Sequence, residues 1–182
     1  MDKDRTRWND RYRNNPPPER VCALLPDHVP DGEGKTALDL AGGTGANAAF
    51  LADKGYQVYS VDIADAAIQR LQERGHPRIH PVQADLDTYR PPAERFDLVL
   101  TVRFLDRRLF PYLAEALVPG GVLLIHTLLD DPRRDCPQMT SNREHLLRPN
   151  ELVRSFSNLR IVFYREHFSD TECLASLVAY RD

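Results

Sequence analysis

Features of metal-binding, disulfide-rich or membrane-spanning proteins are scarce in this sequence. Its 182 residues contain three cysteines, an odd number, and no C-x-x-C pair. Because Cys22, Cys136 and Cys173 lie far apart in the chain, the sequence predicts neither a zinc knuckle nor a disulfide framework. Apolar runs such as residues 122–125 are far too short to cross a bilayer. The composition therefore predicts a protein with no bound metal and with reduced cysteines.

Strong charge of one sign and a targeting segment are also missing. The formal net charge is −3, so no overall field directs the chain to nucleic acid or to an anionic membrane. The first residues contain no apolar stretch of the kind found in a signal peptide. We therefore expect a cytoplasmic protein without nucleic-acid or membrane partners. The length suits one domain with a full core.

What the sequence does contain is an alternation of strand-like and helix-like blocks, which is typical of an α/β fold with a mainly parallel sheet. The last two strand-like blocks have no helix between them, so we expect an antiparallel hairpin at the sheet edge. The predicted strands span residues 35–40, 57–61, 79–83, 96–102, 122–128, 159–166 and 173–180. The predicted helices span residues 46–54, 64–74, 107–117 and 151–156.

Two further segments lie outside this alternation. A helical stretch at residues 5–13 is followed by three consecutive prolines, which favour a stiff extended bend, and by a short helix predicted near residues 19–25. We interpret residues 1–34 as a helical cap on a domain of residues 35–182. Residues 130–149 form a polar insertion, and loops of this length inside a compact domain are often lids or binding loops.

The most informative stretch is residues 37–48, where a short apolar strand runs through Asp39 into a glycine-rich turn and then a helix. The glycines are Gly42, Gly43 and Gly45. Such a turn lets a ligand approach bare backbone N–H groups at the positive end of a helix. An acid beside the turn suits a ligand that carries positive charge. The combination predicts a site for a nucleoside with a cationic tail.

Two other ligand classes compete for this loop. A Walker-type phosphate loop is excluded, because Gly45 is followed by alanine and asparagine rather than by Lys-Ser/Thr. A dinucleotide site is a more serious alternative, since Gly43, Gly45 and Ala48 satisfy the G-x-G-x-x-A form. Asp62 also follows about 20 residues later, at the end of the second predicted strand. An NAD-dependent oxidoreductase thus stays open, although the chain has no Tyr-x-x-x-Lys pair.

Further signals follow in a fixed order. Asp85 stands just after the third predicted strand, a Phe-Asp-Leu-Val stretch opens the fourth at residues 96–99, and a Pro-Gly-Gly turn at residues 119–121 leads into the fifth. With the Leu-Asp-Leu-Ala-Gly-Gly-Thr-Gly loop at residues 38–45 and with Asp62, they match successive motifs of one family in order. The chain resembles the class I S-adenosylmethionine-dependent methyltransferases, and within them the small tellurite-resistance-type group.

The resemblance covers roughly residues 35–129, and the closing hairpin extends it to the C-terminus. It implies a single-domain, Rossmann-like class I methyltransferase fold, with seven mostly parallel strands, a C-terminal antiparallel hairpin and helices on both faces. Two positions depart from the family pattern. Ala41 replaces the first glycine of the loop, and Ala46 stands where relatives often carry an arginine, which removes one expected side-chain contact.

The resemblance implies S-adenosylmethionine as the cofactor and S-adenosylhomocysteine as its product. Backbone N–H groups of the loop would face the carboxylate, and Asp39 would supply negative potential for the ammonium. Asp62 would accept from both ribose hydroxyls, Asp85 from the adenine amine, and the Leu86 N–H would donate to a ring nitrogen. The expected cofactor contacts are Arg11, Asp39, Gly43, Thr44, Gly45, Asp62, Ile63, Asp85, Leu86 and Val102. Tyr12 is an alternative to Arg11 as the residue of the N-terminal helix that closes over the cofactor.

The resemblance leaves the acceptor open. Methyl transfer needs alignment and exclusion of water more than a fixed catalytic side chain, so no catalytic residue is assigned. His126, Glu166 and His167 are candidate bases at strand ends. The leading hypothesis is a methyltransferase for a small-molecule acceptor, acting as a monomer or homodimer. The alternatives are a non-catalytic domain that binds or senses S-adenosylmethionine and, less favoured, an NAD-dependent oxidoreductase.

Overall fold

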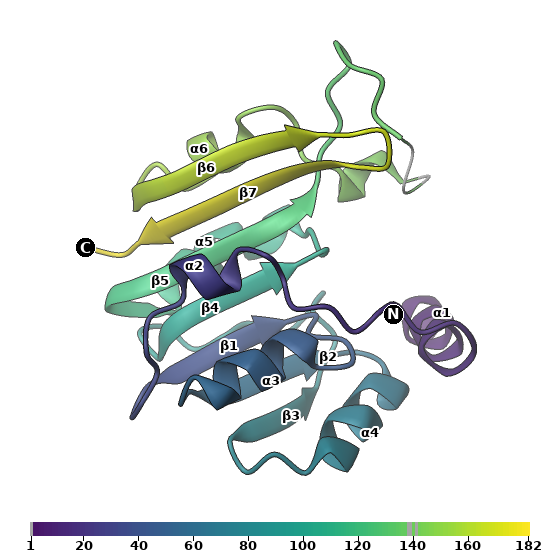
Figure 1. The fold of residues 1–182 in the computed structure, drawn as a ribbon, viewed down its shortest axis with the longest axis vertical. Helices are drawn as coiled ribbons and strands as arrows, with labels where there is room; N and C mark the ends of the chain where they lie inside the picture. The colour runs from purple at the N-terminus through teal and green to yellow at the C-terminus, as the bar shows by residue number, and fades with distance from the viewer. Residues whose placement is uncertain (1, 138–139, 141) are drawn as a thin grey trace. The chain divides into compact units, whose positions relative to one another are not determined.

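The seven predicted strands are all present in the computed structural model, which describes residues 2–137, 140 and 142–182 (Figure 1). They form a mixed, mostly parallel sheet in the order β3-β2-β1-β4-β5-β7-β6. The predicted fold class is therefore confirmed. The chain divides into two compact units, Met1–Arg90 and Pro91–Asp182. The boundary predicted between residues 34 and 35 lies inside the first of them.

Three parallel strands form the centre of the first unit: β1 (Thr36–Leu40), β2 (Gln57–Asp62) and β3 (Ile79–Gln83). The connecting helices α3 (Ala46–Asp53) and α4 (Asp65–Arg74) fall where the sequence predicts them. Both bury a face of small or aliphatic side chains, which lets a helix lie close to a sheet. All three strands therefore end at the same edge, from which the loops toward the helices depart.

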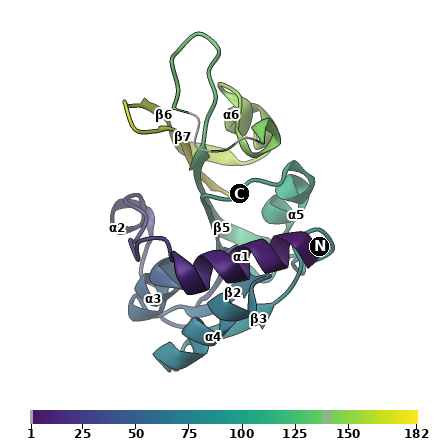
Figure 2. The same cartoon turned by 90° about the vertical axis from the view of Figure 1, so that its right-hand side faces the viewer.

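The N-terminal helix α1 (Asp2–Asn14) packs against α4, as Figure 2 shows. No side chain of α4's own segment caps its N-terminus. Asn9 of α1 supplies this cap: its Oδ1 accepts from the Ala66 N–H at 2.9 Å and its Nδ2 donates to Asp65 at 2.7 Å. Arg70 donates back to the Tyr12 carbonyl at 2.6 Å. The amino-terminal helix is thus held to the first unit by specific polar contacts.

The short helix predicted near residues 19–25 is wrong. The structure has α2 at Leu25–His28, where a proline occupies the first turn. Proline is tolerated only there in a helix, because it lacks an N–H to donate and its ring clashes with the preceding turn.

The second unit contains β4 (Phe96–Val102), β5 (Leu117–Leu128), β6 (Arg160–Phe168) and β7 (Cys173–Tyr180). β4 and β5 are parallel, while β7 pairs antiparallel with both β5 and β6, which confirms the predicted hairpin. β5 begins earlier than predicted because its first residue pairs with β4 across a register shift. The helix expected at residues 107–117 is a 3-10 turn, η1 (Arg107–Leu109), followed by α5 (Phe110–Glu115). The remaining helical segments are η2 (Arg143–His145) and α6 (Glu151–Ser155).

The cysteines depart from the sequence expectation. Cys136, in the polar insertion, forms a disulfide with Cys173 at the start of β7, with their Cα atoms 5.7 Å apart. The two residues are separated by 37 positions, and only the folded chain brings them within bonding geometry. The prediction of reduced cysteines without a disulfide is therefore wrong for this pair. Residues 138, 139 and 141 of the insertion lie outside the described residues.

Candidate functional site

The glycine-rich loop after β1 turns sharply through left-handed backbone conformations. Gly43 and Gly45 have φ values of +57° and +86°, and Ala41 has φ of +54°. Ala41 replaces the first family glycine, and the positive φ explains why glycine suits the position. At Gly42 a Cβ would lie 2.1 Å from Ser60 Oγ, so a side chain there would displace the serine. The loop therefore presents bare backbone beside the end of β1.

Asp62, the last residue of β2, is oriented by this loop. Its Oδ2 accepts from the Gly43 N–H at 3.0 Å, and its Oδ1 accepts from the Ala64 N–H at 2.9 Å. Burial raises the pKa of the Asp62 carboxyl, and the two backbone hydrogen bonds oppose that rise. Oδ1 keeps lone-pair capacity for a further donor, whereas Oδ2 also accepts from the Tyr12 hydroxyl at a long 3.5 Å, a contact that a ligand hydroxyl could replace. This arrangement suits a carboxylate that accepts from a pair of hydroxyl groups.

Asp39 is a buried acid that has no cationic partner in the described part of the chain. Its side chain is 1% exposed, and Ser60 Oγ donates to its Oδ2 at 3.4 Å. Burial raises the pKa of Asp39 to about 7, and the nearby Asp62 carboxyl adds to the rise. No Lys, Arg or His among the described residues forms an ion pair with Asp39. A positively charged ligand group would stabilise the ionised form of such a buried carboxyl group.

The side chain that lies over the loop is Tyr12. Tyr12 is 6% exposed, and its hydroxyl oxygen lies 3.5 Å from Asp62 Oδ2. The Tyr12 hydroxyl oxygen also lies 3.0 Å from the position that a Cβ on Gly43 would take. The predicted contact Arg11 is exposed, and its guanidinium lies 5.7 Å from the centre of the Trp8 ring. The sequence left Arg11 and Tyr12 open as alternatives for the residue of the N-terminal helix that covers the loop, and in the structure Tyr12 lies over it.

The remaining predicted contacts of the first unit lie at the ends of its strands. Thr44 is buried, and its carbonyl accepts from Arg74 Nε at 3.1 Å. Asp85 closes a turn after β3, since its Oδ1 accepts from the Asp87 N–H at 2.9 Å, and Leu86 is buried. Because parallel strands end at one edge, the first unit brings together Asp39, Gly43, Thr44, Gly45, Asp62, Ile63, Asp85 and Leu86. Val102 ends β4 in the second unit.

In the second unit, polar side chains gather where β4 and β5 end. Val102 is in register with His126 of β5, and His126 is in register with Ser176 of β7. His126 Nδ1 lies 2.9 Å from Ser176 Oγ, and burial, reinforced by the positive charge of Arg103, lowers the pKa of His126. Arg103 has φ of +58° and forms an ion pair with Glu172. Left-handed backbone at a non-glycine residue is often found at functional sites.

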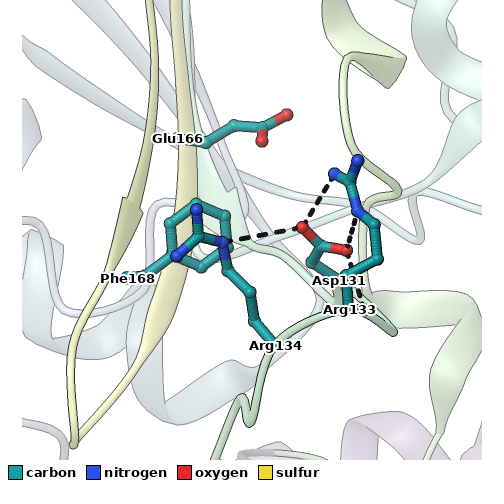
Figure 3. A pocket seen from close by; sticks show the side chains of 5 residues that line it. All are labelled: Asp131, Arg133, Arg134, Glu166 and Phe168. Atoms are coloured by element: carbon teal, nitrogen blue, oxygen red, sulfur yellow. Dashed lines mark hydrogen bonds and ion pairs between the residues drawn. The ribbon is translucent and has the colours of Figure 1, made fainter.

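The other candidate bases are placed less favourably. Glu166 accepts from the Tyr164 hydroxyl at 2.5 Å and from the Asn150 N–H at 2.6 Å, so its carboxylate is already engaged. His167 is exposed on β6. Glu166 also lines a pocket of about 340 Å³ (Figure 3).

That pocket carries balanced charge. Its Asp131 is 1% exposed and forms ion pairs with both Arg133 and Arg134. The Arg134 guanidinium also lies 4.2 Å from the centre of the Phe168 ring, over which Figure 3 shows it stacked. These arginines are therefore already neutralised and do not form an open anion site. Among the described residues, no group of His, Cys, Asp and Glu side chains could hold a metal ion.

Residues 37–121 match the family model described as "Methyltransferase domain". This part of the chain is similar to that family, and it makes up somewhat less than half of the 182 residues. The match begins in β1 and includes the glycine loop, Asp62 and Asp85, so it spans the site of the first unit.

No curated protein matches the sequence. Within the described residues, every helix is too short or too polar to span a membrane.

Solved structures resemble this protein in fold over most of the chain. TehB from Haemophilus influenzae shares 19% identity with a TM-score of 0.70, covering 96% of this chain and 67% of that one. An S-adenosylmethionine-dependent methyltransferase from Mesorhizobium loti shares 19% identity at a TM-score of 0.72, covering 88% and 98%. Geranyl diphosphate C-methyltransferase from Streptomyces coelicolor, in complex with S-adenosylhomocysteine, shares 14% at 0.71, covering 87% and 74%. At these identities the likeness establishes the fold.

Proposed function

We propose that the protein transfers the methyl group of S-adenosylmethionine to a small-molecule acceptor. The observation that carries the proposal is the pair of buried acids beside the glycine loop. Asp39 has no cationic partner among the described residues, and Asp62 is aimed by the Gly43 and Ala64 N–H groups. A dinucleotide site explains Asp62 but gives no role to a buried carboxylate next to the loop.

The residues fit this cofactor group by group. The Gly43 and Gly45 N–H groups donate to Asp62 Oδ2 and to the Gly42 carbonyl, so the Thr44 N–H would hold the cofactor's carboxylate. Asp39 would hold its ammonium and Asp62 its ribose hydroxyls. Tyr12, from the N-terminal cap, would cover the loop. The cofactor supplies a methyl carbon that is already activated, so the protein has to align the acceptor and exclude water.

Calorimetry with S-adenosylmethionine, S-adenosylhomocysteine and NAD tests the proposal. We expect the first two to bind and NAD not to bind. Asp62→Ala should weaken S-adenosylhomocysteine binding at least tenfold, which corresponds to about 1.4 kcal/mol, because two ribose hydroxyls lose their acceptor. Asp170→Ala, at an exposed turn of the second unit, is the matched control and should bind as the wild type does. NAD binding without a response to S-adenosylhomocysteine would contradict the proposal.

Labelled cofactor then separates the enzyme from a sensor. Methyl transfer to any member of a panel of thiols, phenols and amines supports the enzyme. Tight cofactor binding with no transfer across the panel would instead favour a domain that senses S-adenosylmethionine.

A further inference from the structure

We propose that Tyr12 determines which ligands the glycine loop accepts: it admits a nucleoside whose 5′ tail carries no phosphate and excludes a nucleoside 5′-diphosphate or dinucleotide. The inference rests on the nucleoside site of the proposed function. It goes beyond that function because it assigns the selection to one side chain of the N-terminal helix α1. All the residues that carry it belong to the first unit.

The backbone of the loop would by itself suit a dinucleotide. Gly43, Gly45 and Ala48 satisfy the G-x-G-x-x-A form, and Asp62 ends β2, where dinucleotide sites place their ribose acceptor. In such sites the second glycine lets the backbone approach the pyrophosphate closely. The side chains that lie beside the glycines therefore decide whether a diphosphate can reach this loop.

The space beside both glycines is occupied by side chains of the protein. A Cβ on Gly45 would lie 2.2 Å from Leu71 Cδ2, so this glycine serves the close packing of the buried Leu71 of α4. A Cβ on Gly43 would lie 3.0 Å from the Tyr12 hydroxyl oxygen and 3.6 Å from the ring carbon Cζ. Only Gly43 of the two thus has a face that a ligand could share, and the phenol ring of Tyr12 covers it.

The contacts of α1 with α4 hold Tyr12 in this position. Its carbonyl accepts from Arg70 Nη2 at 2.6 Å, and its ring stacks on Trp8 with the ring centres 5.6 Å apart. The ring also packs against the alanines around the start of α4. The contact of the hydroxyl with Asp62 Oδ2 is long, at 3.5 Å, so a ribose hydroxyl can replace it while the ring stays in place. We therefore assign the exclusion to the ring and not to the hydroxyl.

The charges beside the loop also oppose a phosphate. Asp39 and Asp62 are both buried at the ends of the strands that border it. Arg74 reaches the loop, but its Nε donates to the Thr44 carbonyl at 3.1 Å and its Nη2 lies 2.6 Å from a carboxylate oxygen of Glu19. A diphosphate here would therefore lie beside two carboxyl groups and a guanidinium that is already paired. A tail with a positive charge meets no such opposition.

Calorimetry of the full chain with adenosine and with ADP, without divalent metal, tests the inference, because the two ligands differ only in the 5′ diphosphate. The wild type should bind adenosine at least about 30-fold more tightly than ADP. Tyr12→Ala should reduce this ratio at least about tenfold, since a phosphate can then reach Gly43. Tyr12→Phe should keep the wild-type ratio because it keeps the ring. Tyr112→Ala, at an exposed tyrosine of α5, is the matched control and should also keep it.

Three results would overturn the inference: an unchanged ratio in Tyr12→Ala, equal binding of adenosine and ADP by the wild type, or no binding of adenosine by the wild type. If Tyr12→Ala loses its cooperative thermal transition, Tyr12→Leu replaces it. Leucine keeps apolar contact with the alanines of α4 but is too short to cover Gly43, so the same reduction is expected.

S-adenosylhomocysteine, measured in parallel, separates this inference from the proposed function. If the adenosine and ADP affinities follow the expected pattern but S-adenosylhomocysteine does not bind the wild type, the result counts against methyl transfer and leaves the selection by Tyr12 intact. If S-adenosylhomocysteine binds and Tyr12→Ala leaves the ratio of adenosine to ADP affinity unchanged, the proposed function stands and the selection by Tyr12 is wrong.

Discussion

The two units carry opposite electrostatic character where their parallel strands end. In the first, Asp39 and Asp62 are buried acids whose pKa values are raised, chiefly by burial. In the second, His126 is a half-buried base whose pKa is lowered by burial and by Arg103. The first arrangement is stabilised by a cationic ligand, and the second keeps an imidazole neutral among cations. In both units burial shifts the pKa values toward the neutral form, which raises them for the acids and lowers that of the histidine.

Asp39→Asn should produce the largest change, because it removes the acidic character of the first edge. The folded pKa of Asp39 is about 7 and its usual value is 3.8, so the folded state binds the proton more tightly than the unfolded state does. Its contribution to stability is therefore complete below about pH 4 and declines until about pH 7, by a total on the order of 4 kcal/mol.

Denaturant unfolding across this pH range measures the effect as a difference between wild type and variant. Asp39→Asn should remove the decline, whereas Asp53→Asn, a surface substitution at the end of α3, should retain it. Saturating S-adenosylmethionine should also reduce the decline in the wild type, because its ammonium would compensate the charge. Identical pH profiles for wild type and Asp39→Asn would contradict the electrostatic description of this edge.

The next largest effect is expected in the second unit, where removal of the Cys136–Cys173 disulfide should lower stability. The bond ties the polar insertion of the second unit to the start of β7. Cys136→Ser should lower the free energy of unfolding by about 3 kcal/mol, since the unfolded chain loses a closed loop. Dithiothreitol should destabilise the wild type by a similar amount and leave the variant unchanged. S-adenosylhomocysteine affinity should change little, because no predicted cofactor contact lies in that loop.

Asn9→Ala should have the smallest effect, and it tests whether the hydrogen bonds of Asn9 to α4 hold α1 to the first unit. Asn9 caps the N-terminus of α4 from another helix, so its loss should cost about 1 kcal/mol of stability. Asn14→Ala, an exposed residue at the end of α1, is the control and should be neutral. Differential scanning calorimetry measures both. An unchanged melting temperature in Asn9→Ala would show that the cap does not hold α1.

Local signals in the sequence were enough to predict most elements of both units. Apolar runs bounded by turn residues placed β3, β4 and β7 at their observed bounds. The glycine loop was recognised because strand, acid and glycines lie within a few residues of one another. The order of the later motifs then favoured a methyltransferase over a dinucleotide enzyme. All of these signals act over short stretches of chain.

The features that the sequence did not predict depend on contacts between residues that are far apart in the chain. The disulfide joins positions that are 37 apart, and the early start of β5 depends on its register with β4. Tyr12 reaches the loop because Asn9 docks α1 on α4, which no local pattern reveals. The prediction of a helix near residues 19–25 was wrong for a local reason. The position of one proline determined where the first turn of α2 forms.

By itself, the sequence determined the fold class, the glycine loop and the two acids that point to S-adenosylmethionine, because these features are encoded by neighbouring residues. Only the tertiary structure decided that Asp39 is buried with no counter-charge among the residues described, and that Tyr12 rather than Arg11 lies over the loop. It also decided that Ser176 lies within hydrogen-bond distance of one nitrogen of His126. Burial and hydrogen-bond partners arise from strand register and helix docking. They bring together residues 50 positions apart, beyond the reach of any local pattern.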